Sequence, residues 1–121
     1  MLVEEDRYIY SMIVHFVFFK IGPEITNAKI EEMYAGIKSL SALPGVLKVE
    51  CGRQEEMYEG YADRAKGYTH GLVVYLATRT DLAAYDADPR HLEVKGLIGS
   101  CVDKSKPDPV MAMDWEIDSN L

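Results

Sequence analysis

The chain of 121 residues lacks the features that mark several common functional classes. It has no basic run, and its 20 acidic against 13 basic side chains give a formal net charge of −7. Proteins that bind nucleic acids gather Lys and Arg on one face, so a nucleic-acid partner is not expected. No apolar run approaches the roughly 20 residues of a membrane span, and the acidic start is unlike a secretory signal. We expect a cytoplasmic protein with no membrane partner.

The chain also lacks the familiar motifs of metal and nucleotide chemistry. It has two cysteines, Cys51 and Cys101, with no CxxC pair and no histidine at ligand spacing from either. This usage favours unpaired thiols in a reducing compartment. There is no glycine-rich phosphate loop, no HExxH and no obvious Ser-His-Asp or Cys-His arrangement. We therefore expect neither a metal nor a cofactor.

Four segments carry the patterns of β-strands. Residues 12–19 and 68–77 are apolar at nearly every position, which is typical of strands covered on both faces. Each contains one histidine, His15 and His70, on an otherwise apolar face. Residues 47–51 alternate between apolar and charged side chains, and residues 110–117 form a last strand. The sequence thus predicts a sheet with two central strands.

Helical patterns separate these strands. Residues 24–43 form an amphipathic helix whose apolar stripe includes Met33, Tyr34 and Ile37. Thr80-Asp81 caps a short helix through Tyr85, Pro89 interrupts it, and a second helical segment covers residues 91–102. Residues 53–66 are polar and predict a loop, with Met57, Tyr58 and Tyr61 available to cover something.

The order strand, helix, strand, strand, helix, strand predicts a ferredoxin-like βαββαβ α+β fold with an antiparallel sheet. We assign residues 1–11 to an N-terminal extension, 12–117 to the domain and 118–121 to a C-terminal tail. Helices cover one face of such a sheet, yet both faces of the central strands are apolar. A second copy of the chain is the simplest cover, so a homodimer is expected.

The strongest candidate site joins Tyr85 and His91, which lie six residues apart across Pro89. A helix break there can bring the phenol and imidazole together. We expect His15 and His70 to lie side by side on neighbouring strands, with Asp114 beside them. Each histidine taken alone is more often a hydrogen-bonded core residue. Together they predict an apolar pocket with a few polar groups, suited to taking a proton from carbon beside a carbonyl.

Several motifs resemble the stress-responsive A/B barrel (Dabb) domain family. They are Ile13-Val14-His15, Pro44-Gly45-Val46, Gly67-Tyr68-Thr69-His70, Asp88-Pro89-Arg90-His91 and Met113-Asp114-Trp115. The resemblance covers about residues 12–117 and implies a dimeric α/β barrel. One departure is Asp88, where the family often has a histidine before the proline.

Within that family the resemblance is to polyketide cyclases, and it implies a cofactor-independent ring closure of a small β-polyketone. It makes His91 the general base, assisted by Tyr85, and places His15, His70 and Asp114 in the pocket. The alternatives are a non-catalytic protein that binds a hydrophobic small molecule or acts as an oligomeric scaffold, and, more weakly, a heme- or metal-dependent oxygenase of the superfamily. The apolar wall implied by the resemblance consists of Val17, Phe19, Met33, Tyr34, Ile37, Leu72 and Val74.

Overall fold

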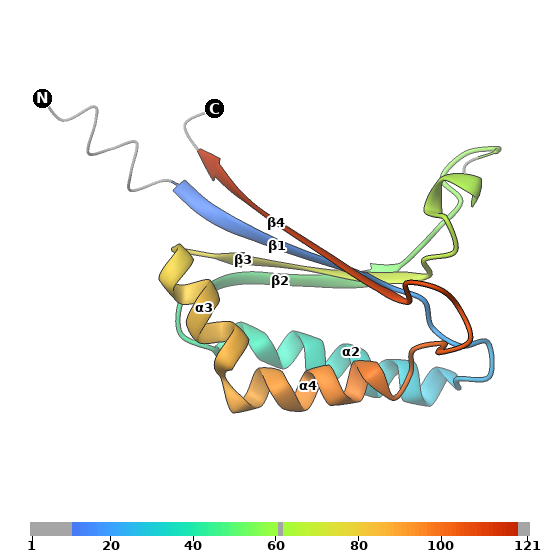
Figure 1. Ribbon diagram of the computed structural model, residues 1–121, viewed down its shortest axis with the longest axis horizontal. Helices are drawn as coiled ribbons and strands as arrows, with labels where there is room; N and C mark the ends of the chain where they lie inside the picture. Colours follow the sequence, from blue (N-terminus) through green and yellow to red (C-terminus); the bar gives the residue numbers. More distant parts are fainter. Residues whose placement is uncertain (1–10, 61, 119–121) are drawn as a thin grey trace, which may run out of the picture.

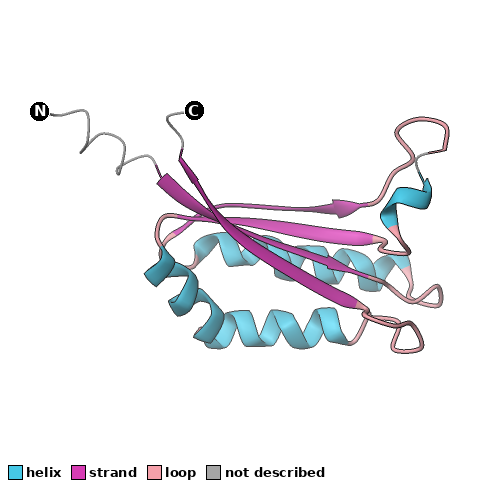
Figure 2. Ribbon diagram, turned by 45° about the horizontal axis from the view of Figure 1, so that its top comes forward, coloured by secondary structure: helices cyan, strands magenta, loops and turns pink. Residues whose placement is uncertain are grey.

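The computed structural model describes residues 11–60 and 62–118, which form one antiparallel sheet with helices packed against one face (Figure 1, Figure 2). The strands are β1 (Ser11–Phe19), β2 (Val46–Arg53), β3 (His70–Leu76) and β4 (Val110–Asp118), in the spatial order β2-β3-β1-β4. This order is the one expected for a ferredoxin-like βαββαβ fold, so the predicted fold class is confirmed. β1 and β3 are the central pair, as their apolar patterns indicated.

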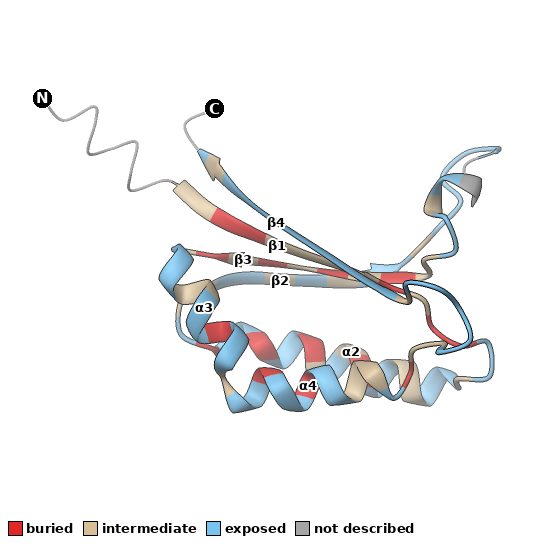
Figure 3. Ribbon diagram, viewed as in Figure 1, coloured by how far each residue is buried: buried red, intermediate tan, exposed pale blue. Residues whose placement is uncertain are grey.

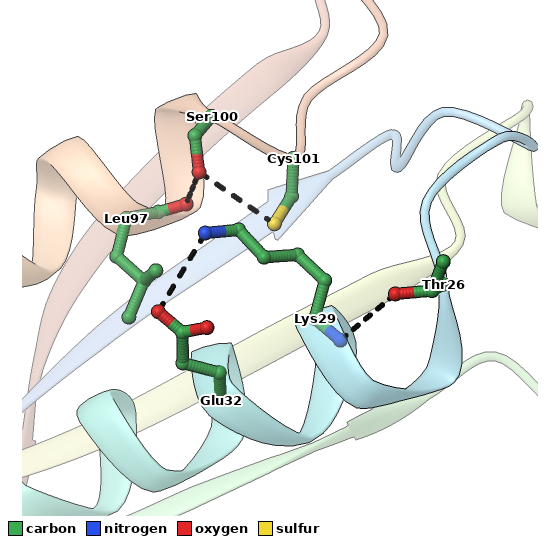
Figure 4. A network of polar contacts seen from close by, with 6 residues as sticks. All are labelled: Thr26, Lys29, Glu32, Leu97, Ser100 and Cys101. Carbon is green, nitrogen blue, oxygen red and sulfur yellow. Dashed lines mark hydrogen bonds and ion pairs between the residues drawn. The ribbon is translucent and has the colours of Figure 1, made fainter.

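The helices are α2 (Asn27–Ser39), α3 (Arg79–Ala87) and α4 (Pro89–Gly99), with short 3-10 turns at Leu40–Ala42 and Ala62–Ala65. α2 begins where the Thr26 hydroxyl accepts a hydrogen bond from the Lys29 amide, at 3.2 Å. The helix predicted over 24–43 is therefore shorter, because Thr26 satisfies a free amide of the first turn. Figure 4 shows this cap beside the end of α4, where the Ser100 hydroxyl donates to the Leu97 carbonyl at 2.6 Å.

The break between α3 and α4 falls at Asp88-Pro89, as predicted. Asp88 ends α3 with an extended backbone and caps α4 through its side chain, which accepts from the Arg90 amide at 2.8 Å. Proline suits the first turn of a helix because that position needs no amide donor. The start of α3 differs from the prediction, since the capping hydroxyl belongs to Thr78 and not Thr80.

The core lies between the sheet and the helices (Figure 3). Its largest fully buried side chains include Phe19, Met33, Ile37 and Leu76. α2 and α4 approach closely at Gly36, where an added Cβ would lie 2.9 Å from a methyl group of Leu97. A larger residue there would require the Leu97 side chain to move.

The second strand departs from the predicted alternation at its start. A register irregularity between Val46 and Lys48 turns Leu47 outward, where it is 57% exposed. Only Val49 and Cys51 of the predicted apolar face remain partly buried against the core.

Cys51 and Cys101 are free thiols. Tyr61, which was predicted to be available to cover part of the molecule, lies outside the described residues.

The face of the sheet opposite α2, α3 and α4 is mostly apolar, and none of these three helices lies over it (Figure 2). We call it the uncovered face. It carries Phe16, stacked on Trp115 with ring centroids 6.0 Å apart, and Met113, which is 60% exposed. A hollow of about 570 Å³ lies on it near Phe18 and Gly71. Within the described residues, no helix is long and apolar enough to cross a membrane.

Candidate functional site

A cavity of about 320 Å³ lies between the sheet and the α3–α4 corner. Three aromatic or imidazole rings that sequence reasoning singled out line it together: His15 from β1, Tyr85 from α3 and His91 from α4. The cavity is otherwise mostly apolar, which is typical of small-molecule sites. Its other lining residues are Val17, Leu40, Leu72, Asp86, Val94, Lys95, Ile98, Gly99, Val110 and Ala112.

The helix break brings Tyr85 and His91 together. Their ring centroids are 4.3 Å apart, although six residues separate them in the sequence. Tyr85 is 2% exposed and His91 is 7% exposed. On one continuous helix a six-residue separation would point the two side chains in different directions. The turn at Pro89 therefore creates the pair.

The hydrogen bond of His91 defines its tautomer. Nδ1 lies 3.2 Å from the backbone carbonyl oxygen of Asp86. Because a carbonyl can only accept, Nδ1 carries the hydrogen, and the neutral ring keeps its lone pair on Nε2. Burial lowers the pKa of His91 below its usual 6.5, against an opposing effect of Asp86. The neutral form, which can accept a proton, is therefore favoured near pH 7.

Tyr85 is held in its neutral, hydrogen-bonding form. Burial raises the pKa of its phenol well above the usual 10, and the nearby Asp86 adds to this shift. A neutral phenol can donate a hydrogen bond to an oxygen that gains negative charge. The site thus pairs a neutral base with a neutral donor.

His15 is the polar residue on the sheet side of the cavity, and Asp114, which is not among the lining residues, holds its ring. They lie opposite each other in the β1–β4 register, and Nδ1 of His15 is 2.5 Å from Oδ1 of Asp114. A carboxylate can only accept, so the imidazole donates and its orientation is fixed. The His15 ring lies edge-on to Tyr85, with centroids 5.8 Å apart. The expected neighbourhood of these two residues is confirmed.

His70 is not part of this arrangement, and the expectation that it lies beside His15 is wrong. β3 runs antiparallel to β1, so His15 faces Val74, whereas His70 faces Phe19 at the far end of the strand. The His70 ring packs parallel to the Phe19 ring, and its Nδ1 bonds to the Thr69 hydroxyl at 2.7 Å. His70 shares a face with His15, but the strand register keeps the two rings apart.

The apolar wall implied by the resemblance is divided by the structure. Val17 and Leu72 line the cavity. Tyr34 instead lies near His70, with ring centroids 6.0 Å apart. The remaining four wall residues are wholly buried core side chains that do not line this cavity: Phe19, Met33, Ile37 and Val74.

Sequence reasoning missed the contribution of α4 beyond His91. Val94, Lys95, Ile98 and Gly99 line the cavity three, four, seven and eight residues after His91, which places them on one face of the helix. That periodic stripe is visible in the sequence and could have been found by extending the helix from His91. Among the described residues, no group of three or more His, Cys, Asp and Glu side chains could hold a metal ion.

Fold and cavity together define a ferredoxin-like α+β domain with a mostly apolar cavity on the helix side of its sheet. Residues 13–117 match the family described as Stress responsive A/B Barrel Domain, and the chain belongs to that family. It is 28% identical over 110 residues to a stress-response A/B barrel domain-containing protein of Arabidopsis thaliana. The match covers 89% of this chain but 38% of that relative, so the chain spans about two fifths of its length.

Solved structures share the fold at low identity. The hydroxynitrile lyase of Passiflora edulis has a TM-score of 0.72 at 19% identity, covering 88% of this chain and 93% of its own. A dimeric ferredoxin-like protein from Jannaschia has a TM-score of 0.72 at 21% identity, with coverages of 88% and 99%. A Dabb family protein from Mesorhizobium loti has a TM-score of 0.64 at 22% identity, with coverages of 87% and 95%.

Proposed function

We propose that the chain is a cofactor-independent enzyme that closes a small β-polyketone into a ring by an intramolecular aldol reaction. The observation that carries this proposal is the pairing of Tyr85 and His91, with ring centroids 4.3 Å apart in one mostly apolar cavity. A base and a hydrogen-bond donor in one apolar cavity are the two groups that enolate chemistry needs.

The proposed reaction begins when Nε2 of His91 takes a proton from carbon between two carbonyl groups. The electron pair of that C–H bond moves to form an enolate, whose oxygen accepts a hydrogen bond from the Tyr85 hydroxyl. The enolate carbon then attacks a second carbonyl of the same molecule and forms the new C–C bond. The His91 imidazolium returns its proton to the resulting alkoxide. His15, held by Asp114, positions the substrate oxygens.

Two further observations support the proposal. The lowered pKa of His91 leaves the ring neutral near pH 7, as a general base requires. A hydroxynitrile lyase is built on the same fold, so the scaffold is compatible with an enzyme. That lyase shares only the fold with this chain, so its reaction is not carried over to this chain.

The test is conversion of a linear tetraketide thioester, whose C2 can attack the C7 carbonyl to close a six-membered ring, into a cyclic product, followed by mass spectrometry. Wild-type protein should accelerate the formation of one cyclic product over buffer. His91→Ala should remove that acceleration while the protein stays folded. Equal product formation with and without wild-type protein would reject the enzyme proposal.

The alternative is a non-catalytic protein that uses the same cavity to bind a hydrophobic small molecule. The mostly apolar lining favours this reading as well. Thermal-shift screening against polyketide mimics and phenolic products separates the two possibilities when combined with the turnover assay. Stabilisation by such ligands without turnover would support the alternative.

We also propose that two copies associate through the uncovered face. Its exposed apolar side chains include Met111, Met113 and Trp115 on β4. A patch of this kind on a sheet marks an interaction surface, and a similar fold is described as dimeric in Jannaschia. Sedimentation of Trp115→Glu tests the proposal. We expect the wild-type protein to be dimeric and the variant to be monomeric at micromolar concentration.

A further inference from the structure

The cavity-facing side of α4 contains one charged residue, Lys95, among side chains that are otherwise mostly apolar or small. His91, Val94, Lys95, Ile98 and Gly99 all line the cavity and form one stripe along the helix. Apart from His91, the stripe is apolar or small except at Lys95. A lysine on the solvent-facing side of α4 would keep its ammonium group hydrated. A lysine on the cavity side places a positive charge beside apolar surface, so its position there is informative.

Lys95 lies one helical turn beyond His91, near enough to act on it electrostatically. Its positive charge contributes to lowering the pKa of His91, after the larger effect of burial. The side chain is exposed while still lining the cavity, so its stem lies on apolar surface and its ammonium reaches water. Within residues 11–60 and 62–118 it has no ion pair with any carboxylate of this chain.

Lys95 is also the only lysine or arginine that lines this cavity in the described part of the chain. The one acidic residue in the lining, Asp86, is exposed, and its backbone carbonyl accepts the hydrogen bond from His91. The charged groups that both line the cavity and act on His91 are Asp86 on α3 and Lys95 on α4, while His15 on β1 and Asp88 before α4 also interact with it electrostatically. An anionic group that enters the cavity is attracted by Lys95 and repelled by Asp86.

We propose that Lys95 makes the cavity selective for ligands that carry an anionic group, such as a carboxylate, next to an apolar body. This inference rests on the proposed function, because it names the substrate class of the same site. The apolar body occupies the lining formed by residues such as Val17 and Ile98, while the anion meets the ammonium at the exposed end of the cavity. The carboxylate stays partly hydrated there, so its desolvation costs little.

Selectivity of this local kind suits a protein whose overall charge is unfavourable for anions. The formal net charge of −7 gives no long-range attraction for an anionic ligand. Recognition must therefore come from a group inside or at the edge of the cavity. Lys95 is placed to supply it.

The experiment compares two ligands of nearly equal shape, 4-butylbenzoate and 4-butylbenzamide. Binding is followed by NMR through the imidazole signals of His91, which report on this cavity and require no turnover. For wild-type protein we expect the benzoate to bind roughly 3- to 10-fold more tightly than the benzamide at low salt. Raising the salt concentration should reduce that preference because the ion pair is exposed.

Three variants sharpen the comparison. Lys95→Met keeps an unbranched helix-forming side chain without the charge, so the preference should fall to about 1-fold while benzamide affinity stays the same. Lys104→Met removes an exposed lysine outside the cavity and should keep the preference. Asp86→Asn removes the repelling charge and should increase the preference for the benzoate.

Equal affinity of wild-type protein for the two ligands would overturn the proposal, as would an unchanged preference in Lys95→Met. Failure of both ligands to shift the His91 signals at millimolar concentration would also overturn it. These outcomes are separate from those of the turnover test. Anion selectivity without turnover would reject the enzyme proposal and support the proposal for Lys95. Turnover without anion selectivity would support the enzyme proposal and reject the proposal for Lys95.

Discussion

His91 and His70 have the same exposed fraction, 7%, yet their surroundings differ in kind. Burial lowers the pKa of each ring below 6.5, with Arg53 adding to the effect at His70. Each ring also forms a hydrogen bond through Nδ1. The partner of His91 is the Asp86 carbonyl, and the partner of His70 is the Thr69 hydroxyl. His91 lines a cavity with Tyr85, whereas Nε2 of His70 is buried and has no hydrogen-bond partner among the residues that the structure describes.

This difference teaches that burial and a lowered pKa do not identify a catalytic histidine. Both rings are held neutral by the same physical effect, the cost of burying a charge. His70 also borders the hollow near Phe18 and Gly71, but its Nε2 is buried, whereas His91 shares its cavity with the Tyr85 phenol. Access, more than protonation, separates a base from a core residue.

The largest expected effect comes from removing each imidazole in turn. His91→Ala should reduce the turnover of a linear tetraketide thioester by roughly 10²- to 10⁴-fold, the usual contribution of a general base. His70→Ala should leave the rate per folded molecule within about threefold, since His70 does not line the cavity. Rates normalised to the folded fraction, measured by circular dichroism, make the comparison. A larger loss in the His70 variant would reverse our assignment.

The second largest effect is expected from changing Tyr85, the tyrosine that shares the cavity with His91. Tyr85→Phe keeps the buried ring and removes the hydroxyl that we propose donates to the enolate oxygen. Turnover should fall by about 10²-fold, while the free energy of unfolding changes little. Denaturant titration with the kinetic assay provides the measurement. A variant with wild-type turnover would exclude the phenol from the reaction.

The third prediction closes the cavity without touching either histidine. Gly99 lines the cavity, and an added Cβ there would meet no atom within 4 Å. Gly99→Leu should weaken the binding of 4-butylbenzamide by about tenfold, because the new side chain occupies part of the cavity. Gly96 lies on the same helix with similar open space but outside the cavity lining. Gly96→Leu is therefore the matched control and should bind as wild type.

The fourth prediction concerns the structural role of His70. His70→Ala should lower the free energy of unfolding by about 2 kcal/mol, because it leaves a void beside Phe19. His70→Leu should recover part of that loss, since it refills the space and removes a buried nitrogen that has no partner. Urea denaturation of the three proteins measures this order. A Leu variant less stable than the Ala variant would contradict it.

The smallest effect is a dependence of stability on pH. Both histidines have folded-state pKa values below 6.5, so the unfolded chain takes up protons first as the pH falls. Stability is therefore full above about pH 6.5 and declines as the pH drops through the lowered folded-state values. Urea denaturation between pH 7.5 and pH 5 should show this decline, with a smaller slope in His70→Leu. Stability that rises on acidification would contradict the lowered values.

The sequence predicted the features that depend on local chemistry and on strand alternation. The helix break follows from Pro89, and the Asp88 cap confirms why it occurs there. The neighbourhood of His15 and Asp114 follows from the order of the strands and the alternation of faces. These inferences needed no distances, because a strand face and a proline break are properties of a few adjacent residues.

The sequence could not predict the features that depend on register. Strand alternation placed His15 and His70 on one face, but the pairing of His70 with Phe19 depends on how the strands align along their length. Strand alternation likewise predicted that Leu47 faces the core, but the register irregularity between Val46 and Lys48 places it on the outside. The position of Lys95 on the cavity side of α4, by contrast, could have been inferred by extending the helical stripe from His91.

The most direct test of the central claim is deuterium exchange into the methylene group of methyl 3-oxohexanoate, followed by NMR in D₂O. It measures proton removal without requiring ring closure or a natural substrate. Wild-type protein and His70→Ala should both raise the exchange rate above that of buffer, and His91→Ala should return it to the buffer rate. An undiminished rate in His91→Ala would show that His91 is not the base.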